Sequence, residues 1–110
     1  MDSAALVRQY YDALDSHAYE TLEEDVLVPD FVQRRPDRTF EGREAFVRFM
    51  REDRPNTDTS HDLASVVVDS EGDRVAVRGR VLDDDGPLFE FADFFELANG
   101  RIVGLETYSR

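Results

Sequence analysis

The segment FEFADFFEL, residues 89–97, places one carboxylate, that of Asp93, among phenylalanine side chains. Successive side chains of a strand point to opposite faces, and the odd-numbered positions of this segment form the more apolar face. Asp93 lies in the middle of that face, so we expect it to point inward unless a β-bulge shifts the register. Because burying an unpaired charge costs several kcal/mol, an inward Asp93 requires a partner, a proton or a function.

Two chemical states are open to an inward Asp93. Desolvation raises the pKa of a buried carboxyl, and a protonated Asp93 would donate a hydrogen bond inside an apolar pocket. An arginine partner would instead keep it ionised, and the chain contains thirteen arginines. Three of them share the outer face of the preceding strand, where we expect acidic partners across the sheet: Arg74, Arg78 and Arg80 beside Glu90 and Glu96.

Tyr10 and His61 are the other side chains whose types suit acid–base chemistry. Tyr10 lies four residues from both Leu6 and Leu14, on the apolar stripe of a predicted helix. It is therefore either a core aromatic or a hydrogen-bond partner of Asp93. His61 opens a predicted strand with apolar residues on its own parity, so it is either a base facing the interior or a histidine held by an ordinary hydrogen bond.

The elements that must position these residues follow from the spacing of apolar side chains. Helical spacing predicts three helices, the first capped by Ser3: 4–15, 19–26 and 43–53. From residue 59 onward the period changes to two, which predicts four strands joined by short turns: 61–70, 73–83, 87–97 and 101–109. We interpret segment 28–37, with two prolines, as a loop around a short extended piece. The order predicts a single α+β domain over 1–110, a cone-shaped barrel of three N-terminal helices on a curved, mostly antiparallel sheet.

The composition excludes several classes of partner. Twenty-five acidic residues face thirteen arginines and no lysine, for a net charge of −12, which argues against nucleic acid and anionic membranes. No cysteine is present, and the two histidines form no metal-binding motif. We therefore infer neither a metal nor another cofactor. The absence of an eighteen-residue apolar run predicts no transmembrane helix, and we expect a cytoplasmic location.

The acidic excess without lysine also bears on the source of the protein. Such a composition resembles that of proteins from salt-accumulating halophiles, where molar salt screens the repulsion between carboxylates. The alternative is a GC-rich genome, in which arginine codons displace lysine. A halophilic origin predicts an unfolding free energy that rises with molar salt in denaturant melts. Equal stability in dilute buffer would favour the alternative.

Three segments carry a resemblance to a known family: VRQYYDALDSHAYETLEEDVLVPDFV, FEGREAFVRFM and FEFADFFELANGRIVGLETY. In this order they resemble the nuclear transport factor two-like superfamily, in its SnoaL-like or ketosteroid-isomerase-like branch. The resemblance implies a pocket at the open end of the cone and a homodimer, which we expect to form through the outer sheet face. Members include isomerases, polyketide cyclases, epoxide hydrolases, dehydratases and binding modules, so the family alone does not define a function.

The resemblance also implies roles for individual residues. Tyr10 matches the oxyanion-binding tyrosine of ketosteroid isomerases, and Asp93 matches their protonated aspartic acid. Arg35 stands where those enzymes carry their general base, and the nearest carboxylate, Asp37, lies two residues further on. We expect four side chains to contact a ligand: Phe49, Phe91, Phe95 and Arg35.

Three functions are compatible with these features. The first is a domain that binds a small hydrophobic molecule in a pocket ending in Tyr10, Asp93 and His61. The second is an isomerase, cyclase or hydratase that works without metal, with Tyr10 and Asp93 donating to an oxyanion and His61 moving the proton. The third is a dimeric scaffold whose cavity is vestigial and filled by its own phenylalanines.

Overall fold

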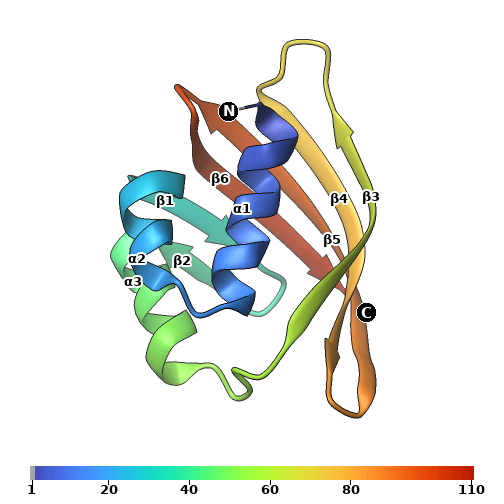
Figure 1. The fold of residues 1–110 in the computed structure, drawn as a ribbon. Coiled ribbons are helices and arrows are strands. Elements are labelled where there is room, and N and C mark those ends of the chain that lie inside the picture. Colours follow the sequence, from blue (N-terminus) through green and yellow to red (C-terminus); the bar gives the residue numbers. More distant parts are fainter. Residues whose placement is uncertain (1) are drawn as a thin grey trace.

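The computed structural model describes residues 2–110, which form one six-stranded sheet with three helices packed on it (Figure 1). The strands lie in the order β2-β1-β6-β5-β4-β3, and every neighbouring pair is antiparallel except β1 and β6. Their bounds are β1 Leu27–Arg34, β2 Thr39–Glu41, β3 Ser60–Val68, β4 Arg74–Asp83, β5 Gly86–Ala98 and β6 Arg101–Ser109. The predicted α+β fold is confirmed. Within the described residues, no helix has the length and apolar character needed to cross a membrane.

The three predicted helices are present, and the first matches its predicted bounds to within one residue, whereas the regular parts of the other two are shorter than expected. Their bounds are α1 Ser3–Asp15, α2 Tyr19–Thr21 and α3 Arg43–Arg48, the last two continuing as π-helical turns η1 Leu22–Val26 and η2 Phe49–Asp53. The predicted cap of α1 is wrong by one residue. Asp2 accepts a hydrogen bond from the backbone N–H of Ala5 at 2.7 Å, whereas Ser3 already lies in the helix and bonds to the Gly72 carbonyl.

The alternation in β5 confirms that Asp93 points inward. Phe91, Asp93, Phe95 and Leu97 are buried, while Phe94 between them is 50% exposed. The two register irregularities of this strand lie on either side of Asp93, between Pro87 and Phe89 against β4 and between Glu96 and Leu97 against β6, so neither turns Asp93 to the outer face. The apolar parity of the segment was therefore sufficient to place the carboxylate.

The interpretation of 28–37 as a loop around a short extended piece underestimates the extended piece, because β1 covers most of that segment. Phe31 and Gln33 point inward and are buried, and β1 pairs in parallel with β6 and antiparallel with β2. The register against β6 shifts between Leu27 and Val32. Pro29 lies within that irregular part, where its missing N–H removes no regular ladder bond.

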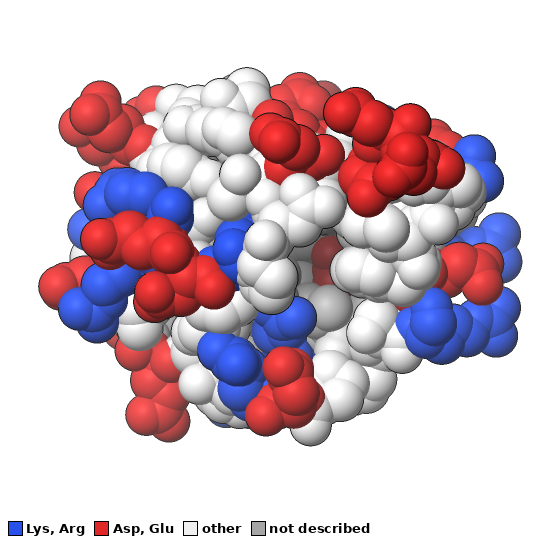
Figure 2. Space-filling view, turned by 90° about the horizontal axis from the view of Figure 1, so that it is seen from below, with Lys and Arg blue, Asp and Glu red and all other residues white. Residues whose placement is uncertain are grey.

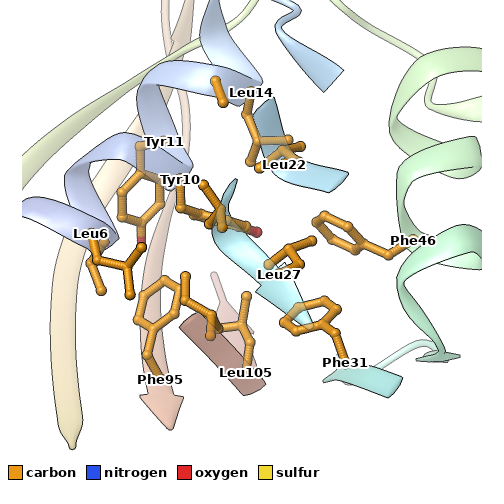
Figure 3. Close-up of a cluster of buried hydrophobic side chains, with 14 of the residues drawn as sticks. Leu6, Tyr10, Tyr11, Leu14, Leu22, Leu27, Phe31, Phe46, Phe95 and Leu105 are labelled. Carbon is orange, nitrogen blue, oxygen red and sulfur yellow. The ribbon is translucent and has the colours of Figure 1, made fainter. Parts of the chain in front are cut away.

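The core lies between the sheet and the helices (Figure 3). Tyr10 and Tyr11 extend from α1 in different directions, and Phe46 of α3 faces Phe31 of β1 with ring centroids 5.1 Å apart. Phe95 contacts both tyrosines, at centroid distances of 5.3 and 5.9 Å. These rings fill much of the space between the sheet and the helices.

The outer face of the sheet carries the charged residues as predicted, but its ion pairs differ. Arg80 lies opposite Glu90 in the register, yet it binds Asp62 of β3 at 3.0 Å, and Glu90 binds Arg110 at 3.2 Å. Two aromatic side chains on strands β5 and β6, Phe94 and Tyr108, are half exposed and lie 6.0 Å apart between ring centroids. The homodimer expected through this face stays a prediction.

Candidate functional site

A cavity of about 510 Å³ opens between the C-terminal part of α1, the segment after β1 and the β4–β5 hairpin. Figure 2 looks at this end of the molecule and shows a hollow bordered mainly by uncharged residues, with an acidic side chain visible in its depth. The polar residues of its interior are Tyr10, Tyr11, Gln33, His61, Asp93 and Thr107. The size lies in the usual range for small-molecule sites, and the phenylalanines do not fill it.

Asp93 is held by two hydrogen bonds at the inner end of the cavity. Its Oδ2 accepts from the Tyr11 hydroxyl and its Oδ1 accepts from the Thr107 hydroxyl, each at 2.6 Å. Thr107 in turn accepts from Nε2 of Gln33 at 2.9 Å. Gln33, Thr107 and Asp93 stand on the neighbouring strands β1, β6 and β5, so a hydrogen-bonded row crosses the inner face of the sheet.

The tyrosine bonded to Asp93 is Tyr11, so of the two roles left open for Tyr10 the hydrogen bond to Asp93 is wrong and the core aromatic is confirmed. Tyr10 is buried and lines the cavity, but within residues 2–110 its hydroxyl makes no hydrogen bond. The two side chains lie about 100° apart around α1, so one can reach β5 while the other points elsewhere. Tyr10 thus remains a free donor inside the cavity.

Burial controls the protonation of these groups. It raises the pKa of both tyrosines well above the usual 10.0, and the nearby Asp93 charge raises it further. Both hydroxyls therefore keep their protons at any working pH. Burial also raises the pKa of Asp93, while the hydrogen bonds from Thr107 and Tyr11 oppose the rise. No arginine forms an ion pair with Asp93 among the described residues, so desolvation outweighs pairing at this carboxyl.

We expect Asp93→Asn to fold nearly normally, because the amide keeps an oxygen for Thr107 and can donate to the Tyr11 hydroxyl. The pKa of Asp93 is raised above 3.8 in the folded state. Stabilisation by the bound proton is therefore present at low pH and lost as the pH rises through the folded-state pKa. In urea melts, the unfolding free energy of the native protein should fall relative to the variant, by at most about 1.4 kcal/mol per pH unit. A native protein that gains stability over Asp93→Asn with rising pH would contradict this expectation.

His61 faces the cavity and is oriented by a carboxylate at the end of α1. Its Nδ1 lies 2.6 Å from Oδ1 of Asp15, and its backbone N–H donates to Oδ2 of the same residue at 3.0 Å. An ionised carboxylate only accepts hydrogen bonds, so Nδ1 carries the proton and Nε2 of the neutral ring holds a lone pair. The imidazole ring packs against the ring of Tyr11, the hydrogen-bond partner of Asp93, at a centroid distance of 5.0 Å.

The four expected ligand contacts divide into three that line the cavity and one that does not. Phe49, Phe91 and Arg35 line it, whereas Phe95 is 1% exposed and packs in the core beneath the tyrosines. Asp37 reaches the mouth of the cavity, where it forms ion pairs with Arg35 at 3.4 Å and with Arg38 at 3.5 Å.

Five polar residues that define the site escaped the sequence analysis: Tyr11, Asp15, Gln33, Arg54 and Thr107. Gln33 is 4% exposed, and its Oε1 has no hydrogen-bond partner among residues 2–110. Gln33 follows Phe31 by two residues, so in a strand the two side chains point to the same face. This spacing could have indicated that Gln33 is buried, but segment 28–37 was interpreted mainly as a loop. The pairing of Asp15 with His61 carried no local signal, because 46 residues separate them.

Comparisons with known proteins place this fold. The chain superposes on an NTF2-like protein of unknown function from Cytophaga hutchinsonii with a TM-score of 0.84 and 16% identity, over 100% of this chain and 91% of that one. A candidate ketosteroid isomerase from Kribbella flavida superposes with a TM-score of 0.85 and 24% identity, over 98% of this chain and 77% of that one. An LEH-like epoxide hydrolase from M. tuberculosis superposes with a TM-score of 0.78 and 17% identity, over 98% of this chain and 82% of that one. A search of curated proteins finds no match.

These structures define the class of protein, which has the NTF2-like fold of helices on a strongly curved sheet. The family model for the SnoaL-like domain matches residues 7–105. The chain belongs to the SnoaL-like domain family. The resemblance inferred from the sequence is thereby confirmed at the level of fold and family.

Proposed function

We propose that this protein binds a small, mostly apolar molecule in the cavity, with a polar group of the ligand directed towards its inner end. The single observation that supports this proposal is a cavity of about 510 Å³ in which apolar walls surround a few convergent polar side chains. A filled interior would have favoured the scaffold hypothesis, and the phenylalanines here leave the space open. Binding would bury the apolar part of the ligand, while Tyr10 supplies an unengaged hydroxyl.

Titration calorimetry with bicyclic aromatic probes tests the proposal. A naphthalene derivative should bind the native protein at one saturable site. Val81 lines the cavity, so Val81→Trp should fill part of it and weaken binding at least tenfold. Val67→Trp is the matched control, because Val67 lies on the neighbouring strand β3 and is 60% exposed; it should bind as the native protein does. The proposal fails if no probe binds, or if both tryptophan variants bind equally well.

A second candidate function, acid–base catalysis, is favoured by the contact between Asp15 and His61. A carboxylate that orients an imidazole is a common arrangement for a general base. In this reaction Nε2 of His61 would remove a proton from the substrate, and the free Tyr10 hydroxyl would donate to the oxygen on which negative charge develops. Asp93 would orient Tyr11 and, when protonated, act as a further donor. Proton transfer of this kind fits the isomerase name carried by one structural neighbour.

A further inference from the structure

Two arginine side chains converge on one wall of the cavity, at the helical turn η2. Arg54 donates from Nε to the Met50 carbonyl at 2.9 Å. The Arg35 guanidinium lies 5.9 Å from the ring centroid of Phe49, the residue that precedes Met50 in the chain. Both arginines line the cavity, and Figure 2 shows basic side chains next to the hollow. The molecule has a net charge of −12, so the partners of these two cations decide whether positive charge is available to a ligand.

The charge of Arg54 is not compensated by a carboxylate. Besides the Met50 carbonyl, its guanidinium donates from Nη2 to the Tyr19 hydroxyl at 3.1 Å and to the Leu14 carbonyl at 3.5 Å. All three acceptors are neutral, and across residues 2–110 no Asp or Glu lies within ion-pair distance of Arg54. These bonds hold the side chain in place while leaving its positive charge available.

The carboxylates that line the cavity already have other partners. Asp37 is shared between Arg35 and Arg38 at the mouth, and Asp93 accepts from Tyr11 and Thr107 at the inner end. Neither satisfies Arg54. Nε and Nη2 of Arg54 are engaged in the bonds to its three neutral acceptors, so the two N–H groups of Nη1 are the donors left for a ligand. A hydrogen bond from a charged donor to a carboxylate is stronger than one between neutral groups.

The Tyr10 hydroxyl lies within the influence of both cations. Burial dominates and raises the pKa of Tyr10, whereas the charges of Arg35 and Arg54 act in the opposite direction. Tyr10 also stands one helical turn before Leu14, whose carbonyl Arg54 contacts. A free hydroxyl donor and a guanidinium without a carboxylate partner therefore line the same cavity.

We propose that the ligand of this cavity is an organic carboxylic acid with an apolar body, whose carboxylate binds Arg54 with the Tyr10 hydroxyl as a second donor. The apolar body then contacts Phe49, Val81 and Phe91. This assignment rests on the proposed binding function and adds the chemical class of the ligand. In an acidic protein, the local charge of Arg54 is what overcomes the general repulsion of anions.

The test compares two probes of the same shape, 2-naphthoate and 2-naphthamide, by titration calorimetry. The native protein should bind the acid about tenfold to a hundredfold more tightly than the amide. Arg54→Gln should lose this preference while keeping its affinity for the amide. Arg38→Gln is the matched control, because Arg38 lies at the mouth in an ion pair with Asp37 and does not line the cavity; it should keep the preference.

The outcomes separate this inference from the binding function. Equal affinity for acid and amide in the native protein contradicts the acid assignment and leaves binding intact, whereas failure of both probes to bind overturns both proposals. Loss of amide affinity in Arg54→Gln would show that Arg54 acts only as a structural cap of α1. Should that variant not fold, raising the salt concentration on the native protein decides: the preference for the acid should shrink if it comes from a charge pair, and a salt-independent preference contradicts the proposal.

Discussion

Replacing His61 by alanine should slow proton removal from a substrate in the cavity by about two to four orders of magnitude. His61 is the imidazole that lines the cavity, and Asp15 fixes its Nδ1 as the protonated nitrogen. The ring opening of 5-nitrobenzisoxazole is a suitable probe, because it requires only a base that removes a carbon-bound proton and an apolar site. The rate of nitrophenolate release measures the effect. Asp15→Asn should cause a smaller loss, because the imidazole remains but its tautomer is no longer imposed.

The second histidine provides the control for this experiment. His17 is exposed at the junction after α1, where its Nε2 contacts the Thr57 carbonyl at 2.6 Å. His17→Ala should therefore react like the native protein. If the native protein is no faster than His61→Ala, the catalytic candidate is lost, whereas the binding function is unaffected because it does not need a base.

Gly79→Ala should lower the unfolding free energy by about 1–3 kcal/mol. A Cβ at residue 79 would lie 2.5 Å from the Asp62 carbonyl oxygen and 3.0 Å from Cζ of Phe91. The carbonyl belongs to the backbone of β3 and cannot rotate away, so β3 and β4 must separate locally. Because Phe91 also lines the cavity, the variant should bind an apolar probe more weakly as well. Denaturant melts and calorimetry measure the two effects.

The same substitution at Gly104 is the control for Gly79→Ala. Gly104 also lies within a strand, β6, but the nearest atom to its added Cβ would be the Val32 carbonyl oxygen at 3.9 Å. Gly104→Ala should be neutral or stabilise by a few tenths of a kcal/mol, because alanine restricts the unfolded chain. Equal destabilisation at both positions would show that strand glycines matter here for a reason other than close packing.

Local periodicity was sufficient for the parts of the fold in which one face of an element is apolar. The alternation around Asp93 predicted its inward direction, and helical spacing predicted the burial of Tyr10. The extended piece of 28–37 was underestimated because Pro29 and Asp30 interrupt the alternation. That segment forms strand β1 between two partners, β2 a few residues later and β6 about seventy residues later. The parallel pairing with β6 is long-range, so the spacing of apolar residues within the segment does not reveal it.

The choice between Tyr10 and Tyr11 depended on the rotation of α1 about its own axis. Both residues are buried, since α1 packs on the sheet beside the other helices (Figure 1). The apolar pattern of the helix is compatible with either tyrosine pointing towards β5. Packing against Phe91 and Phe95 turns Tyr11 to Asp93. A family resemblance can predict that a tyrosine of this helix contacts Asp93. It cannot predict the rotation of the helix accurately enough to choose between two adjacent tyrosines.

The sequence by itself determined the fold class, the family and the inward direction of Asp93, because apolar periodicity and ordered motifs are local properties of the chain. Only the tertiary structure decided which groups meet: Tyr11 with Asp93, Asp15 with His61, and Arg54 with acceptors that are all neutral among residues 2–110. These contacts join elements that are distant in the chain, so they exist only after the helices have packed on the sheet. The sequence contains thirteen arginines, so it was compatible both with a protonated Asp93 and with an Asp93 ionised beside an arginine. The three-dimensional arrangement directs the arginines elsewhere and gives Asp93 two hydroxyl donors in place of a cation.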